Sequence, residues 1–103
     1  MIDNELNLAE LVLAEMKKMG FEADSIARVT CSRQYRDAGT MAPSFQKSML
    51  TMVFFEILLG QGGEPAPAQI RMALSAATDA IGWLDDMKLV ILPFLKENEK
   101  KFF

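Results

Sequence analysis

Histidine is absent from the 103 residues of this chain, and cysteine occurs once, as Cys31. The lack of histidine excludes a His-based catalytic triad and a His-ligated metal site. A single cysteine excludes an intramolecular disulfide and the clustered thiolates of a zinc finger. We therefore expect no metal site and no cofactor, and we expect that the protein is not an enzyme.

Long hydrophobic runs are also missing. The longest apolar stretch, residues 49–59, contains Thr51 and Glu56, and a membrane-spanning helix needs about 20 apolar residues. The first five residues include Asp3 and Glu5 and no basic residue, whereas a secretory signal begins with positive charge. These features predict a cytoplasmic protein that does not enter a membrane and whose cysteine stays reduced.

Basic residues are outnumbered by acidic ones. Eleven Lys and Arg against fourteen Asp and Glu give a net charge of −3, so the chain as a whole is not attracted to nucleic acid. Half of the residues are hydrophobic and 24% are charged, as in folded domains. We expect one domain, 1–103, in which the Gly- and Pro-rich loop 60–67 joins an N-terminal and a C-terminal half.

Apolar residues recur at helical spacing over much of the chain, which predicts an all-α fold, a compact bundle of four to five helices. Within residues 4–19, the stripe includes Leu8, Val12 and Met16. Asn7 and Glu10 have the spacing of a capping box, so the helix could begin later than residue 4. Gly20 suits the left-handed position that follows a helix.

Residues 24–37 fit a helix or a strand. Asp24 could cap a helix and Gly39 could end one, yet Ala27, Val29 and Cys31 alternate with polar residues as in a strand. We favour a helix, with a short β-hairpin within residues 26–58 as the alternative.

Residues 45–59 form the most hydrophobic segment, preceded by Ser44 as the expected cap and ended by Gly60. No side of this segment is polar at helical spacing, and a helix that is apolar all round is normally buried on every side. The few other helices of so short a chain can hardly enclose it. We therefore predict a homodimer or a tight hetero-assembly, with a homo-oligomer favoured.

The C-terminal half predicts two helices. The first follows Pro67, carries an inner stripe that includes Ile70 and Leu74, and is broken or bent at Gly82. The second spans about residues 83–100 and is expected to kink or restart at Pro93. On a helical wheel, Leu89 and Leu92 lie on its polar side, three residues apart, where they could anchor a partner.

Two residues could support chemistry. Cys31 lies between Arg28 and Arg33, and nearby cations favour a reactive thiolate; we favour instead a buried, inert thiol packed against the first helix. Glu56 stands alone among apolar residues, where burial would raise its pKa towards that of a general acid. Its other interpretation is a carboxylate that reaches the surface or pairs with an arginine.

Eight methionines are the most unusual feature of the composition, since flexible thioethers suit surfaces that adapt to a partner. We predict a protein-binding accessory protein (an adaptor, a chaperone-like subunit or an inhibitor) that acts through an apolar surface. The predicted binding residues are Met41, Met49, Met52, Leu89, Leu92, Phe102 and Phe103.

Two other functions stay open. Arg28, Arg33 and Arg36 could contact phosphates in a small nucleic-acid-associated regulator, although three positive charges are few for that role. A small enzyme or ligand-binding protein would use Glu56 or Cys31.

Overall fold

The computed structural model describes residues 7–60, 70, 73–74 and 79–103. Throughout these ranges the regular structure is helical, so the predicted all-α fold is confirmed and the alternative β-hairpin within 26–58 is wrong. The helices are α1 (Leu8–Lys18), α2 (Ala23–Thr30), α3 (Arg33–Ala38), α4 (Pro43–Leu59), α6 (Ala80–Asp86), the π-helix η1 (Met87–Ile91), α7 (Leu92–Glu97) and α8 (Glu99–Phe102).

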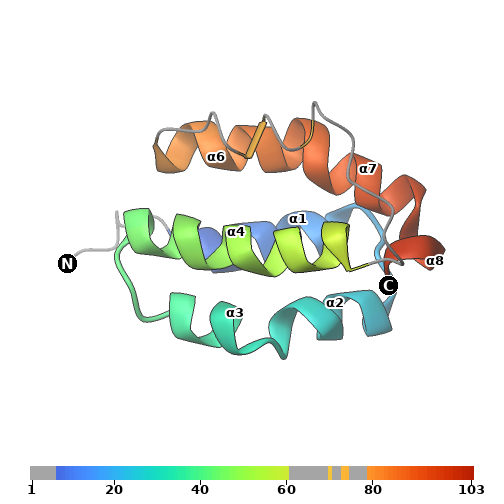
Figure 1. Ribbon diagram of the computed structural model, residues 1–103, viewed down its shortest axis with the longest axis horizontal. Helices are drawn as coiled ribbons and strands as arrows, with labels where there is room; N and C mark the ends of the chain where they lie inside the picture. Colours follow the sequence, from blue (N-terminus) through green and yellow to red (C-terminus); the bar gives the residue numbers. More distant parts are fainter. Residues whose placement is uncertain (1–6, 61–69, 71–72, 75–78) are drawn as a thin grey trace.

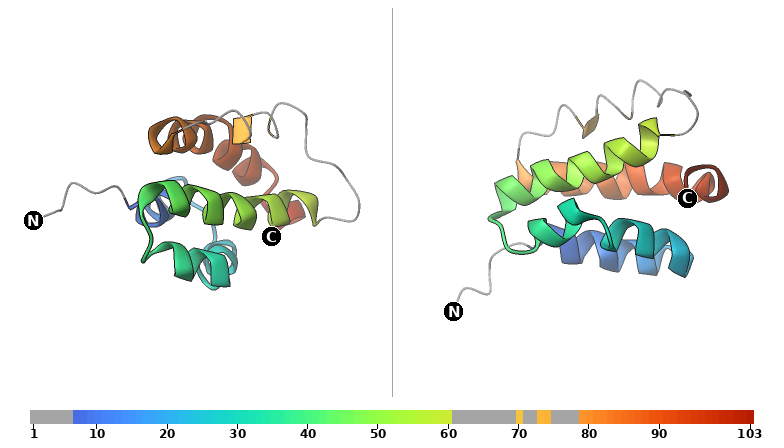
Figure 2. Two further views of the ribbon diagram at one scale, coloured as in Figure 1. Left: turned by 60° about the vertical axis from the view of Figure 1, so that its left-hand side comes forward. Right: turned by 60° about the horizontal axis from the view of Figure 1, so that its bottom comes forward.

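Helix α4 lies at the centre of the arrangement. It contacts α1, α3 and α6, and in Figure 1 it runs between α3 below and α6 above, with α1 behind it. Helices α2 and α3 follow each other along one side, and α6, η1 and α7 run along the other (Figures 1 and 2). The longest helix is therefore packed on three sides by the rest of the chain.

The caps of α1 match the sequence prediction. The Asn7 side chain accepts a hydrogen bond from the backbone N–H of Glu10 at 3.2 Å, so the helix begins at Leu8; residues 4–6 lie outside the described ranges. Gly20 has φ +85°. The N–H of Phe21 bonds the carbonyl of Met16, which completes the predicted glycine-ended helix.

The segment that fitted helix or strand forms two short helices. Helix α2 ends with Cys31 as its C-cap, and Ser32 then begins α3 by accepting a hydrogen bond from the N–H of Tyr35. Of the apolar residues that alternate in the sequence, Val29 is buried whereas Ala27 and Cys31 are exposed, so the alternation does not mark a buried face. Val29 is buried from α2 and Ala38 from α3, and Tyr35 ties α3 to α1 by donating to the carbonyl of Ala9.

Helix α4 begins at Pro43, before the expected cap Ser44, because proline suits the first helical position. Its one buried polar side chain, Gln46, accepts from the N–H of Ala9 and donates to the carbonyl of Met41. The bond from Ala9 joins α4 to the first turn of α1, and the bond to Met41 holds the residues just before α4. Sequence reasoning treated this segment as apolar all round and did not anticipate them.

In the C-terminal half, Ile70 and Leu74 are buried as predicted, whereas loop residues 61–67 lie outside the described ranges. The prediction for Gly82 was wrong. Helix α6 begins at Ala80, and the Asp79 side chain caps it by accepting the N–H of Gly82 at 2.7 Å. Gly82 therefore lies in the first turn of a helix and does not break one.

A π-helix precedes Pro93, at the predicted irregularity. Proline has no N–H, and its ring would clash with the carbonyl four residues earlier in a regular α-helix. The N–H of Leu92 bonds the carbonyl of Met87, five residues earlier, and this wider turn holds about one extra residue. Side chains after η1 therefore point in a different direction around the helix axis from the one that a regular α-helical wheel gives them.

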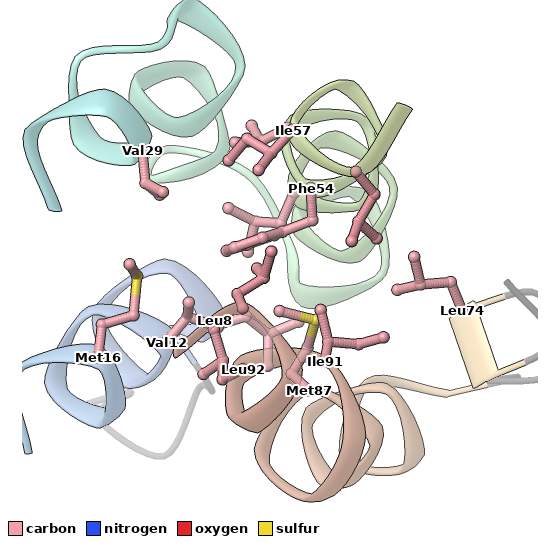
Figure 3. Packing of buried hydrophobic residues seen from close by; sticks show 14 of the residues in the cluster. Leu8, Val12, Met16, Val29, Phe54, Ile57, Leu74, Met87, Ile91 and Leu92 are labelled. Carbon is pink, nitrogen blue, oxygen red and sulfur yellow. The ribbon is translucent and has the colours of Figure 1, made fainter. Parts of the chain in front are cut away.

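This rotation overturns one predicted surface residue. Leu92 is fully buried and points into the core beside Leu8 in Figure 3, while Leu89 is 77% exposed. The two leucines thus lie on different sides of the helix. The wheel failed because it assumed an unbroken α-helical period through Pro93.

Candidate protein-interaction surface

One side of α4 exposes several large apolar side chains. Its exposed residues at helical spacing are, in order, Phe45, Ser48, Met52, Glu56 and Leu59, which we call the α4 stripe. Phe45 is 65% exposed, Met52 47% and Leu59 49%. Large side chains this exposed, aligned on one helix, form the kind of patch that marks protein-interaction sites.

The sequence produces this patch because α4 has more apolar residues than its neighbours can cover. Leu50, Phe54 and Leu58 point into the core and are completely buried. Contacts with α1, α3 and α6 leave the remaining side of the helix to solvent. As expected from the sequence, the single chain does not enclose residues 45–59 on every side, and the uncovered side is apolar.

Charge is nearly absent from the α4 stripe. The helix contains two charged residues, Lys47 and Glu56, and only Glu56 belongs to the stripe. Its carboxylate is exposed, so the burial that would have made Glu56 a general acid does not occur. The interpretation that Glu56 reaches the surface is confirmed.

The three methionines predicted for binding are only partly on the surface. Met52 lies in the middle of the stripe, and Met41 is 36% exposed just before α4 begins. Met49 is half-buried and packs against the core. The methionine cluster therefore contributes to both the core and the exposed side of α4.

Leu89 and the C-terminal residues lie elsewhere. Leu89 is on η1, and Ile81, which is 56% exposed, is on α6. Phe102 is 3% exposed and Phe103 packs against the core, so the predicted surface role of Phe102 is wrong. Its ring lies 5.5 Å from that of Phe94.

The segment 98–103 is held against the start of α2 by a polar cluster. The Glu99 carboxylate accepts hydrogen bonds from the Ser25 hydroxyl at 2.5 Å, the backbone N–H of Glu22 at 2.8 Å and the Lys96 ammonium at 2.9 Å. Helix α2 has no side-chain cap of its own. Glu99 thus does from a distant part of the chain what the acidic residue of a capping box does locally.

These hydrogen bonds change the acidity of Glu99. The Ser25 hydroxyl, then the Glu22 N–H and then Lys96 stabilise the charged form, which lowers the pKa of Glu99 to about 2 from its ordinary value of 4.5. Two open hollows of about 450 and 200 Å³ border this cluster. Since the Glu99 carboxylate already accepts three hydrogen bonds from within the chain, we assign the cluster a structural role.

Arg28, Arg33 and Cys31, which the sequence singled out, lie on or near α2 and α3. Arg28 donates to the carbonyl of Phe102 at 2.6 Å and lies over the ring of Phe103. Arg33 pairs with Asp37 at 3.7 Å and is 86% exposed. Cys31 is exposed, so the prediction that it is buried against the first helix is wrong; it lies at the end of α2, where one side faces solvent.

Sequence reasoning missed Phe45 and Leu59, which were assigned to a buried helix. A residue spacing of seven within a uniformly apolar segment was the available signal, but the sequence could not tell which side its neighbours would leave open. Glu99 was missed because two of its partners, Glu22 and Ser25, are more than seventy positions away.

Other kinds of site find no support in the described ranges. No group of three or more Cys, Asp or Glu there could hold a metal ion, and no buried side-chain polar atom lacks a hydrogen-bond partner. No helix in the described part of the chain is long and apolar enough to cross a membrane. Comparison with protein-family models, with curated proteins and with solved structures finds no match to this chain.

Proposed function

We propose that this protein is a non-enzymatic, protein-binding accessory protein of the cytoplasm, which acts by seating an apolar helix of a partner on the α4 stripe. The observation that carries the proposal is the alignment of Phe45, Met52 and Leu59 on one exposed helix side. Their seven-residue spacing is that of the seam along which two helices pack.

The electrostatics of the α4 stripe support a protein partner. Interface cores are depleted in charged residues and enriched in aromatic residues and methionine. Phe45 and Met52 fit that composition, and Glu56 is the one charge. Phosphate recognition would need a cluster of cations, whereas Arg28 is held by the carbonyl of Phe102 and Arg33 makes an exposed pair with Asp37.

Met52→Lys tests the proposal, because it places a charge at the middle of the stripe without touching the core. We expect the protein to keep its helicity and thermal stability, and to lose at least about tenfold in affinity for a binding partner isolated with the wild type. Leu11→Lys is the matched control, since Leu11 is 40% exposed on α1.

Leu89→Lys is measured beside these two variants, because Leu89 is the most exposed large apolar residue of the described chain. Binding that is lost in Met52→Lys and kept in the other two supports the proposal. Binding that is lost only in Leu89→Lys would place the interface on η1 and contradict it. Equal binding by all three variants would also contradict it.

A further inference from the structure

We infer that the α4 stripe is covered by the same stripe of a second copy of this chain, with the two α4 helices antiparallel about a two-fold axis at Met52. The inference rests on the proposed function and names its partner. Three features of the stripe support this dimer: the spacing of its residues, the place of its single charge and the shape of its side chains.

The positions of the stripe are symmetric about Met52. Ser48 and Glu56 lie four residues to either side of it, and Phe45 and Leu59 lie seven residues to either side. Reversing the helix direction therefore reproduces the same spacing. An isologous dimer requires such a self-complementary patch, in which residue i meets residue j and j meets i.

Antiparallel pairing brings suitable side chains together. Met52 meets the partner's Met52 at the axis, and Phe45 meets the partner's Leu59 at each end, so a large ring lies against a branched side chain. Half-buried Met49 and Phe55, three residues to either side of Met52, flank the stripe on its two edges. The stripe is about 21 Å long from 45 to 59 at 1.5 Å per residue.

The single charge selects the antiparallel direction. In a parallel pair, Glu56 would face the partner's Glu56, and opposed like charges disfavour association. In the antiparallel pair, Glu56 faces the partner's Ser48, whose hydroxyl can donate to the carboxylate. The two carboxylates of the dimer are then separated by about eight residues of helix, roughly 12 Å along the axis.

A second copy also suits the amount of surface available. A stable interface covers about 800 Å² per partner, and the chain exposes 6008 Å² in all, so the contact would take roughly one eighth of the surface. The stripe, flanked by Met49 and Phe55 on the helix and by Met41 just before it, supplies apolar side chains for that contact.

The test uses charge changes at positions 48 and 56 of the purified full chain, measured by sedimentation equilibrium. Ser48→Glu places a carboxylate opposite the partner's Glu56 at two symmetric contacts, so we expect the dimer Kd to rise at least about tenfold. Ser48→Lys should lower it, since it creates two opposite-charge pairs. Adding Glu56→Lys to Ser48→Glu should restore dimerisation.

This rescue separates the dimer from any effect within one chain. Positions 48 and 56 are eight residues apart on one helix, too far for the side-chain contacts made at spacings of three or four. Ala14→Glu and Ala14→Lys, at an exposed position of α1, control for the changes in net charge of −1 and +1. Circular dichroism checks that each variant keeps the wild-type helicity.

Tighter association of Ser48→Lys together with rescue in the double variant supports the inference. A wild-type chain that stays monomeric to about 100 µM overturns it, as does a dimer whose Kd is unchanged by Ser48→Glu and Ser48→Lys. The proposed function is judged separately. If the wild-type chain is a monomer and Met52→Lys lowers its affinity for another protein, the proposed function holds and that other protein is the partner.

Discussion

Replacing Glu99 with glutamine should destabilise the fold although Glu99 is not itself an apolar core residue. The substitution keeps the shape of the side chain and removes the charge that accepts from Ser25, the Glu22 N–H and Lys96. The Glu99 side chain is 11% exposed, so water can replace little of what is lost. The N-terminus of α2 is then left with a weaker acceptor.

The size of the effect follows from hydrogen bonds to a charged group, which contribute about 1.5–3 kcal/mol when one partner is removed. We expect a loss of about 2 kcal/mol in the free energy of unfolding near pH 7. For a domain of about 100 residues, each 1 kcal/mol shifts Tm by about 4–8 °C, so Tm should fall by about 10 °C.

The pH dependence distinguishes this cause from a general defect. Because folding lowers the pKa of Glu99 from 4.5 to about 2, its stabilisation is complete above about pH 4.5 and disappears as the pH falls towards 2. The difference in unfolding free energy between wild type and Glu99→Gln should therefore shrink over that window.

Urea denaturation followed by circular dichroism at pH 7, 4 and 2.5 measures this difference. Glu97→Gln is the matched control, because Glu97 is exposed two residues away and loses the same charge. A Glu99→Gln variant as stable as Glu97→Gln at pH 7 would refute the reasoning. A deficit of constant size from pH 7 to pH 2.5 would do so as well.

Three other outcomes are expected. Leu92→Ala should cost about 2–5 kcal/mol as a core truncation, while Leu89→Ala should change the unfolding free energy by less than about 0.5 kcal/mol; comparable losses in urea denaturation would contradict the π-helical register. Gly20→Ala should lower the free energy of unfolding by about 1 kcal/mol in the same assay, because φ at Gly20 is +85°, a left-handed conformation that disfavours a Cβ. No atom lies within 4 Å of the added Cβ, so a steric clash adds nothing to this cost. An unchanged midpoint would show that the backbone there is not strained. Cys31 should be modified by a thiol reagent as fast in the native protein as in urea, because it is exposed; a protected thiol would contradict its placement.

The sequence was most informative where structure is determined locally. Asn7 and Gly20 cap α1 as predicted, because capping depends on a few neighbouring residues. Pro93 likewise marked the position of an irregular turn. Its consequence for Leu92 could not be predicted, because proline can be accommodated by a kink, a new helix or a π-turn, and each rotates the following residues differently.

The candidate surface was harder to derive from sequence, because it depends on packing. The apolar excess of residues 45–59 correctly indicated that one chain could not cover this helix completely. Which side stays open is decided by how α3 and α6 lie against it, and neither has a sequence signal that fixes its position. Phe45 and Leu59 could therefore be identified only once these neighbours were placed.

The contact between Glu99 and the start of α2 also bears on how the native protein opens. Helix α2 has eight residues, and a helix this short is marginal in water without tertiary contacts. Its first turn is completed by Glu99, and Arg28 in its last turn holds the carbonyl of Phe102. Detaching residues 99–102 would leave α2 without support at both ends, so the two segments should open together as one cooperative unit, and the amide hydrogens of α2 should exchange with solvent at the rate set by that joint opening.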